Sequence, residues 1–234
     1  MSRKNALPVA VLVVVFVAVW PPASALAQNT CPGCSEPNTN LFPQGFGPHT
    51  YTRWKPFQGV IDDTCPGYPN PTTVSSPCNY TTLYMQNMSD FGDPAAAVAA
   101  IEGFDNQSTT ALTKLQFDRR TDGGCTLTSP RFSIRTKSPD MKYSIGCLQM
   151  TPVTDTFTAV DGRGNTNTWE TRTANTALIA LLTAPGGTII SLAIIYDDGA
   201  KSMVPGPGFV YLDNIEVCTA SCKVWTQPSD NSEH

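Results

Sequence analysis

Eight cysteines are the residues with the clearest chemistry in this sequence. An even number of cysteines in a chain that begins with a secretory signal predicts disulfides. Their order suggests three groups: Cys65 with Cys78, Cys125 with Cys147, and Cys31 and Cys34 with Cys218 and Cys222. The spacing from Cys31 to Cys34 would also suit a redox dithiol or, with the last two cysteines, a zinc site with four cysteine ligands. An oxidising compartment favours disulfides over both alternatives.

Carboxylates are a second group that could do chemistry, as metal ligands, sugar contacts or acid and base. Asp213 lies in an expected strand over 209–217, where counting by twos places it on the more apolar face. A carboxylate there needs a partner, such as backbone N–H groups or a basic side chain. Asp197 and Asp198 follow an apolar strand. They could bind a metal or a sugar hydroxyl, or they could be solvated turn residues.

Aromatic side chains in polar stretches could form a platform on which sugar rings stack. Such rings offer a large contact area at a low cost in conformational entropy. Tyr51 and Trp54 are the strongest candidates, because the residues around them are polar. Trp169 and Trp225 are weaker candidates, because packing in the core and covering a disulfide would explain them equally well.

The sequence lacks the motifs of the common hydrolases. His49 and His234 are its two histidines, and it contains neither Gly-x-Ser-x-Gly nor His-Glu-x-x-His. A glycoside hydrolase needs only two carboxylates, which Asp197 and Asp198 could supply.

Strands in the second half of the chain are expected to position these residues. Apolar and polar residues alternate over 113–118 and 131–135, a pattern that predicts half-buried strands. Further strands are expected over 143–147, 156–160 and 169–173. Segments that are apolar on both faces predict central strands over 176–182 and 188–196, before the last strand over 209–217. About eight strands separated by turns are typical of a β-sandwich or barrel.

One short helix and an irregular segment complete the expected fold. Asp93 as N-cap, Pro94, an alanine-rich run to Ile101 and then Gly103 predict a helix over 94–101. Residues 28–90 are expected to form a Cys/Pro-rich segment that packs on a sandwich core of residues 91–222, with a tail over 223–234.

The N-terminal segment predicts export. A basic start, an apolar run from Ala6 to Trp20 and the small residues of Ala25-Leu26-Ala27 predict a signal peptide over 1–27. The alternative is an uncleaved membrane anchor, but the run is shorter than the ~20 residues that a span usually needs. No second apolar stretch is long enough to cross a bilayer, so no span is expected after cleavage. Losing Arg3 and Lys4 leaves 13 basic against 19 acidic residues, a formal charge of −6. Without a basic cluster, nucleic acid is not an expected partner.

The closing strand carries a family resemblance. Gly208-Phe-Val-Tyr-Leu-Asp-Asn-Ile-Glu-Val217 resembles the last strand of secreted jelly-roll domains, including many carbohydrate-binding modules. The stretch from Leu115 to Phe132 is similar to a group of uncharacterised bacterial extracellular proteins. Over roughly residues 110–217, the resemblance implies an all-β, jelly-roll-like sandwich, a fold that hosts many functions. It also implies that Asp213 could ligate a structural Ca²⁺ together with backbone carbonyls.

These observations predict a secreted, non-catalytic module that binds carbohydrate or another cell-surface polymer. Its expected contacts are Tyr51, Trp54, Asp197 and Asp198. A structural or adhesive extracellular protein without a small ligand is one alternative, and a carboxylate-dependent glycoside hydrolase is another.

Overall fold

A computed structural model describes residues 41–60, 81–89, 95–152, 156–197 and 208–225. The chain divides into two units, residues 1–36 and 37–234, and every described residue belongs to the second unit. Within these ranges, no helix has the length and apolar character needed to span a membrane. The predicted signal peptide lies outside the described residues.

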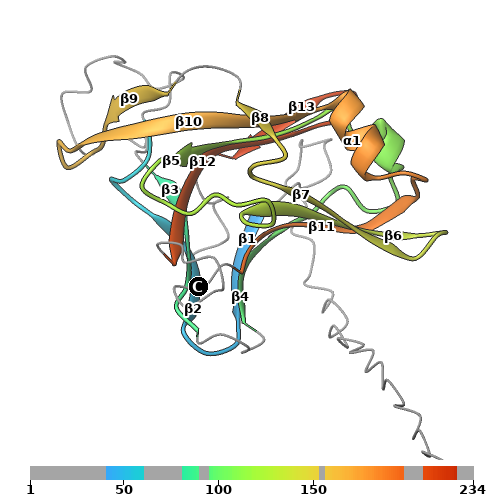
Figure 1. Cartoon of the computed structure of the whole chain (residues 1–234), viewed down its shortest axis with the longest axis horizontal. Helices are drawn as coiled ribbons and strands as arrows, with labels where there is room; N and C mark the ends of the chain where they lie inside the picture. The colour runs from blue at the N-terminus through green and yellow to red at the C-terminus, as the bar shows by residue number, and fades with distance from the viewer. Residues whose placement is uncertain (1–40, 61–80, 90–94, 153–155, 198–207, 226–234) are drawn as a thin grey trace, which may run out of the picture. The chain divides into compact units, whose positions relative to one another are not determined.

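The described strands form two antiparallel sheets (Figure 1). The first is a five-stranded sheet with the order β1 (Leu41–Phe46), β4 (Ala96–Ile101), β11 (Thr188–Tyr196), β6 (Arg131–Lys137) and β7 (Met141–Gly146).

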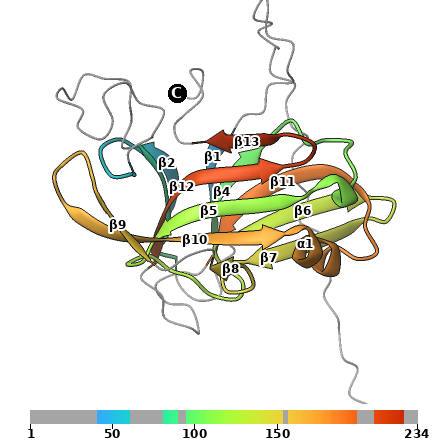
Figure 2. The same cartoon turned by 90° about the horizontal axis from the view of Figure 1, so that it is seen from above.

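The second sheet has eight strands. Its main order is β2 (Thr50–Lys55), β3 (Thr82–Asn87), β12 (Phe209–Cys218), β5 (Lys114–Arg120), β10 (Thr166–Asn175) and β8 (Thr151–Pro152). Two further strands complete it, because β13 (Cys222–Trp225) pairs with β12 and β9 (Phe157–Val160) pairs with β10. Figure 2 shows β12, β5 and β10 running side by side.

The inner faces of the two sheets share one apolar core. Phe117 of β5 and Phe132 of β6 stack across the layers with ring centres 5.7 Å apart, and neither ring is exposed to solvent. Buried leucine, isoleucine and valine side chains from both sheets surround this pair. Burial of this apolar surface is the main force that holds the layers together. The prediction of an all-β sandwich is therefore confirmed.

The structure has one short α-helix, but it is not at the predicted position. Residues 96–101 form β4, which lies between β1 and β11 in the five-stranded sheet, so the predicted helix over 94–101 is wrong. Ala99 pairs with Pro43 on one side and with Ile194 on the other. β4 is buried on both faces, and this tertiary setting outweighs the helix propensity of alanine.

The helix α1 (Thr176–Leu182) instead replaces a predicted central strand. Asn175 ends β10 and caps the helix, because its side-chain oxygen accepts a hydrogen bond from the Leu178 N–H at 3.0 Å. Only Ile179 of the helix is buried. A 3-10 turn, η1 (Thr109–Ala111), is the other short helical element in the described part.

Three strands come from the segment that was expected to be irregular. β1 and β2 form within residues 41–55, and β3 follows at residues 82–87. β1 joins the five-stranded sheet, whereas β2 and β3 join the eight-stranded sheet. The segment expected to be irregular therefore contributes strands to both sheets.

Two disulfides lie in the described residues. Cys125 and Cys147 are bonded, with their Cα atoms 5.4 Å apart, as their order predicted. Cys218 and Cys222 bond to each other and close the turn between β12 and β13. The predicted pairing of these two with the first two cysteines is therefore wrong. The alternative of a zinc site with four cysteine ligands is also wrong, because a disulfide leaves no thiolates to ligate a metal. The remaining cysteines, Cys31, Cys34, Cys65 and Cys78, are outside the described residues.

Candidate functional site

A β-bulge in the closing strand determines which side chains leave the core. Asp213 pairs with Asp118 of β5, but Glu216 pairs with Gln116, so β12 contains one extra residue. The extra residue lies near Asn214, whose φ of 44° is in the left-handed region. Val210 and Leu212 before the bulge and Ile215 and Val217 after it all lie in the core. The simple alternation predicted for this strand is therefore wrong, and Tyr211 and Asp213 lie on the opposite face from Ile215 and Val217.

A row of aromatic and cationic residues crosses the outer face of the eight-stranded sheet. We define this outer face as the one that carries Tyr84 and Tyr211, away from the core. Cross-strand partners in a sheet point to the same side. The strand pairing places the following residues in one row: Arg53 with Tyr84, Tyr84 with Tyr211, Arg120 with Trp169, and Trp169 with Phe157.

The aromatic rings of this face pack against one another. Tyr84 and Tyr211 have ring centres 4.8 Å apart, and Phe209 lies 5.7 Å from Tyr211. Tyr51 meets Tyr84 edge-on at 6.2 Å. Tyr84 and Tyr211 are buried, whereas 38% of the Tyr51 surface is exposed. Tyr51 therefore offers the most open ring on this aromatic floor.

Cationic side chains lie over these rings. The Lys55 ammonium nitrogen is 3.2 Å from the centre of the Tyr84 ring and 5.3 Å from that of Tyr211. The Arg120 guanidinium carbon is 3.5 Å from the centre of the Tyr211 ring, and that of Arg53 is 4.8 Å from the Tyr51 ring. The negative faces of the rings attract these cations.

The positive charges of this cluster affect one another. Partial burial, followed by the nearby charges of Arg53, Arg120 and Arg163, lowers the pKa of Lys55 to about 8. Arg120 forms an ion pair with Asp122 at 2.7 Å. Within the described part of the chain, no carboxylate forms an ion pair with Arg53, Lys55 or Arg163. We call Arg53, Lys55, Arg120 and Arg163 the cationic cluster.

The structure separates the two aromatic residues predicted as a platform. Tyr51 lies on the outer face of the sheet. Trp54 follows it by three positions in β2, and because side chains alternate between the two faces of a strand, Trp54 points to the other face and packs against the core. Trp54 Nε1 is buried without a hydrogen-bond partner among the described residues. The prediction that Trp54 joins Tyr51 in a ligand platform is therefore wrong. Trp225 also packs in the core, edge-on to Phe104 at 6.5 Å.

The predicted aspartate contacts lie elsewhere. Asp197 follows β11 of the five-stranded sheet and forms an ion pair with Arg131 at 2.6 Å. The two line a shallow hollow with Thr128, Lys142 and Ser144. Asp198 lies outside the described residues. The structure therefore does not bring Asp197 together with Tyr51, which lies on the other sheet.

Asp213 is buried with backbone partners, one of the alternatives that the sequence left open. Its Oδ2 accepts a hydrogen bond from the Val60 N–H at 2.7 Å, and its Oδ1 accepts one from the Asn214 N–H at 2.8 Å. Gly59 is required beside it, because a Cβ there would lie 2.5 Å from Asp213 Oδ2. N–H groups turn the positive ends of their dipoles toward the carboxylate, unlike the oxygen shell that Ca²⁺ prefers. Both carboxylate oxygens of Asp213 therefore have N–H partners, and calcium here stays a prediction of the closing-strand resemblance.

Asp118 is buried opposite Asp213. Its Oδ1 accepts a hydrogen bond from Thr171 Oγ1 at 2.5 Å, and its Oδ2 accepts one from Asn214 Nδ2 at 2.7 Å. Burial raises the pKa of Asp118, and these two hydrogen bonds only partly oppose the effect. The pair Asp118 and Asp213 thus holds the bulge of β12 in place through Asn214.

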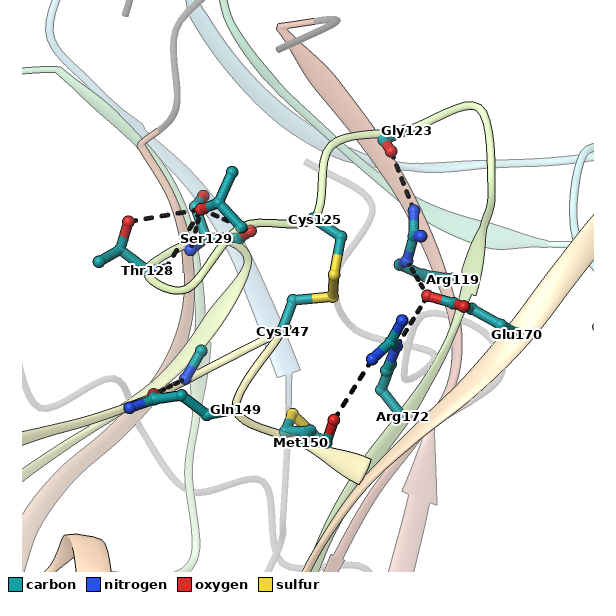
Figure 3. The surroundings of a disulfide bond; sticks show 12 residues. Arg119, Gly123, Cys125, Thr128, Ser129, Cys147, Gln149, Met150, Glu170 and Arg172 are labelled. Atoms are coloured by element: carbon teal, nitrogen blue, oxygen red, sulfur yellow. Dashed lines mark hydrogen bonds and ion pairs between the residues drawn. A yellow bond between two sulfur atoms is a disulfide. The ribbon is translucent and has the colours of Figure 1, made fainter. Parts of the chain in front are cut away.

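A buried ion network lies on the inner side of the same sheet, beside the first disulfide (Figure 3). Arg119 and Arg172 both donate to Glu170 Oε1, at 2.5 and 2.7 Å. Arg119 also donates to the Gly123 carbonyl at 2.9 Å, and Arg172 to that of Met150 at 3.3 Å. Burial alone would raise the pKa of Glu170, but the two arginines outweigh burial and lower it. The network ties β5 and β10 to the loops that lead to the disulfide.

No protein-family model matches this chain, and neither do any of the curated proteins or solved structures with which it was compared. The functional interpretation therefore depends on the arrangement of its own residues. The cationic cluster is the main feature that the sequence patterns did not predict. Its signal is the period-two pattern Tyr51-x-Arg53-x-Lys55, which places three such residues on one face of a strand.

Proposed function

We propose that this chain is a secreted, non-catalytic binding module for a polysaccharide or a related cell-surface polymer. Its ligand would lie on the outer face of the eight-stranded sheet, over Tyr51, Phe209 and the rings that support them. The observation that carries the proposal is the row of aromatic and cationic side chains across this face. Secretion is supported by the signal-like N-terminal sequence and by the two disulfides.

Aromatic rings on a sheet are suited to binding sugars. The C–H groups on one side of a sugar ring pack on an aromatic face, while its hydroxyl groups accept hydrogen bonds from neighbouring donors. Tyr51 supplies the open ring, and Arg53 and Lys55 on the same strand supply donors. Tyr84 supports Tyr51 from β3, and its own hydroxyl donates to Gln86 Oε1 at 2.6 Å. Side chains on paired strands are held in position, which lowers the entropic cost of binding.

Binding to a panel of neutral and acidic polysaccharides tests the proposal. Affinity electrophoresis or titration calorimetry should detect at least one ligand, and Tyr51→Ala should weaken its binding about tenfold, the effect of losing about 1.4 kcal/mol. Met141→Ala is the matched control, because Met141 is 42% exposed on β7 of the other sheet. A wild-type chain that binds no polymer in the panel would contradict the proposal.

The two alternatives make different predictions. A structural or adhesive protein would self-associate or stay on the cell envelope without binding a soluble polysaccharide. A glycoside hydrolase would cleave one, with two carboxylates as acid and base. Of the two aspartates suggested for this role, Asp197 is held by Arg131, an interaction that lowers its availability to a sugar.

A further inference from the structure

We infer that the polymer bound on this face is an acidic polysaccharide, and that the cationic cluster binds the carboxylate or sulfate groups of its sugar units. This inference rests on the proposed function and names its ligand class. The site consists of Arg53, Lys55, Arg120 and Arg163. Lys55 and Arg120 lie over the rings of Tyr84 and Tyr211, and Arg53 lies over the ring of Tyr51. Arg163 is close enough for its charge to act on Lys55.

The charge balance of this face is the first argument. The whole chain has a formal charge of −4, so an excess of positive charge at one place is unusual for it. Four basic residues lie close enough that three of them lower the pKa of the fourth, Lys55. Among the described residues, the Arg120 pair with Asp122 is the one ion pair that offsets their mutual repulsion. A bound anion would relieve this repulsion, and complementary charge is what gives such a site its specificity.

The placement of the charges beside rings is the second argument. A sugar ring that stacks on Tyr51 would have the Arg53 guanidinium near that ring and Lys55 two residues along the same strand. An acidic substituent at the edge of the sugar could then accept hydrogen bonds from both. Arginine can bind a carboxylate or sulfate with two parallel hydrogen bonds. A neutral polysaccharide would offer only hydroxyl oxygens to these donors and would leave their positive charges unmatched.

A single-stranded nucleic acid also combines flat rings with negative charge. Proteins that bind it use a positive groove that follows many phosphates. The cationic cluster is compact, and the chain around it is acidic, so an acidic glycan fits the observations better. Single-stranded DNA therefore enters the test as a competing ligand.

Lys55 makes the inference testable through pH. The groups that face it are Arg53 on β2, Tyr84 on β3, Tyr211 on β12, Arg120 on β5 and Arg163 before β10. With a pKa of about 8, Lys55 is mostly charged at pH 7 and mostly neutral at pH 9. Burial raises the pKa of Tyr84 above its ordinary value of 10.0, so this tyrosine stays neutral throughout that range. Affinity for an acidic chain should therefore fall between pH 7 and pH 9, while affinity for a neutral chain should not.

The experiment titrates the full-length chain with polygalacturonate, neutral galactan, dextran sulfate and single-stranded DNA at pH 7 and pH 9. We expect polygalacturonate or dextran sulfate to bind at least tenfold more tightly than galactan at pH 7. Lys55→Gln and Arg53→Gln should each weaken this binding about tenfold. Lys55→Arg should bind as the wild type does at pH 7 and keep its affinity at pH 9, because arginine stays charged. Lys142→Gln, on β7 of the other sheet, is the control for non-specific attraction.

The outcomes separate the inference from the proposed function. Binding of galactan that depends on Tyr51 and equals the binding of polygalacturonate would overturn the inference and leave the proposed function in place. Absence of binding to every polysaccharide would overturn both. Tighter binding of DNA than of either acidic glycan, or an equal loss in Lys142→Gln, would also overturn the inference.

Discussion

The ammonium group of Lys55 lies 3.2 Å from the centre of the Tyr84 ring, on the outer face of the eight-stranded sheet. The two residues come from neighbouring strands, β2 and β3, and a second ring, that of Tyr211, lies 5.3 Å from the same nitrogen. The attraction between the ammonium group and the rings offsets part of the repulsion from three arginines.

Lys55 should titrate near pH 8. Between about pH 8 and the ordinary lysine value of 10.5, the unfolded chain binds a proton at this site that the folded chain has lost. The free energy of unfolding should therefore rise with pH across that window. Nuclear magnetic resonance of isotopically labelled lysine side chains would measure the pKa, and Lys55→Met should remove the rise in stability. A Lys55 pKa above 10 would contradict the prediction.

Trp54 should contribute to stability through its size and not through its N–H group. Trp54→Phe keeps an aromatic ring and removes a buried donor that has no partner among the described residues, so we expect it to change the free energy of unfolding little. Trp54→Ala should lower this free energy by about 2 kcal/mol, because the partly buried ring loses its packing against the core. Denaturant unfolding would measure both. A large loss in Trp54→Phe would show that the N–H group has a role that its surroundings do not reveal.

Glu170 should be needed to hold its two arginines. Glu170→Gln leaves Arg119 and Arg172 buried without a counter-charge, and breaking a buried pair in this way costs about 3 kcal/mol. Because the folded state lowers the pKa of Glu170, its contribution is present above the unfolded value of about 4.5. It is lost as the pH falls through the folded value. Urea unfolding should therefore show a smaller difference between Glu170→Gln and the wild type at pH 3 than at pH 7.

Glu216→Gln is the control for this measurement. Glu216 forms one ion pair, with Lys114, and accepts a hydrogen bond from Gln116 Nε2 at 3.2 Å. The Lys114 side chain is 34% exposed, so water screens the ion pair. We expect a smaller loss of stability than in Glu170→Gln. Equal losses in the two variants would contradict the role given to the buried network.

The two disulfides should contribute unequally. Cys125 and Cys147 close a loop over 22 positions, and Cys218 and Cys222 close one over 4. Loop-closure entropy predicts about 3 kcal/mol for the first and about 2 kcal/mol for the second. Double Cys→Ala variants, compared by denaturant unfolding, would measure each contribution. The larger loss should come from the first pair, and the reverse order would contradict the prediction.

Calcium should not stabilise the fold through Asp213. Both of its carboxylate oxygens accept backbone N–H hydrogen bonds, and the neighbouring Asn214 fixes the bulge between it and Asp118. Thermal unfolding with Ca²⁺ and with EDTA should give the same midpoint, because only a ligand of the native state raises it. A calcium-dependent rise that disappears in Asp213→Asn would instead support the metal site implied by the closing-strand resemblance.

Several parts of this fold follow from local sequence patterns alone. Strands β5, β6, β7, β9, β10, β11 and β12 form where the sequence predicts them, because half-buried strands repeat every two residues and turns carry glycine and proline. The disulfide between Cys125 and Cys147 also follows from order along the chain. Both the strand predictions and this disulfide prediction depend only on the order of residues along the chain.

Other features depend on which strands pair, and only the tertiary structure decides them. Residues 96–101 form a strand because β1 and β11 flank them, although alanine itself favours a helix. Residues 176–182 have an apolar pattern that fits a buried strand or a helix, and the Asn175 cap and limited burial make them α1.

The candidate site depends on the same long-range pairing. One extra residue near Asn214 moves Tyr211 and Asp213 away from the core side, and no periodicity reveals such a bulge. Lys55 and Tyr84 are 29 positions apart in the sequence, and Arg120 lies farther still along the chain. The sequence by itself determined the seven strands named above, the turns between them and the aromatic and basic residue types. The antiparallel pairing of β2, β3, β12 and β5 decided that these residues meet on one face, because register is set by contacts between distant segments.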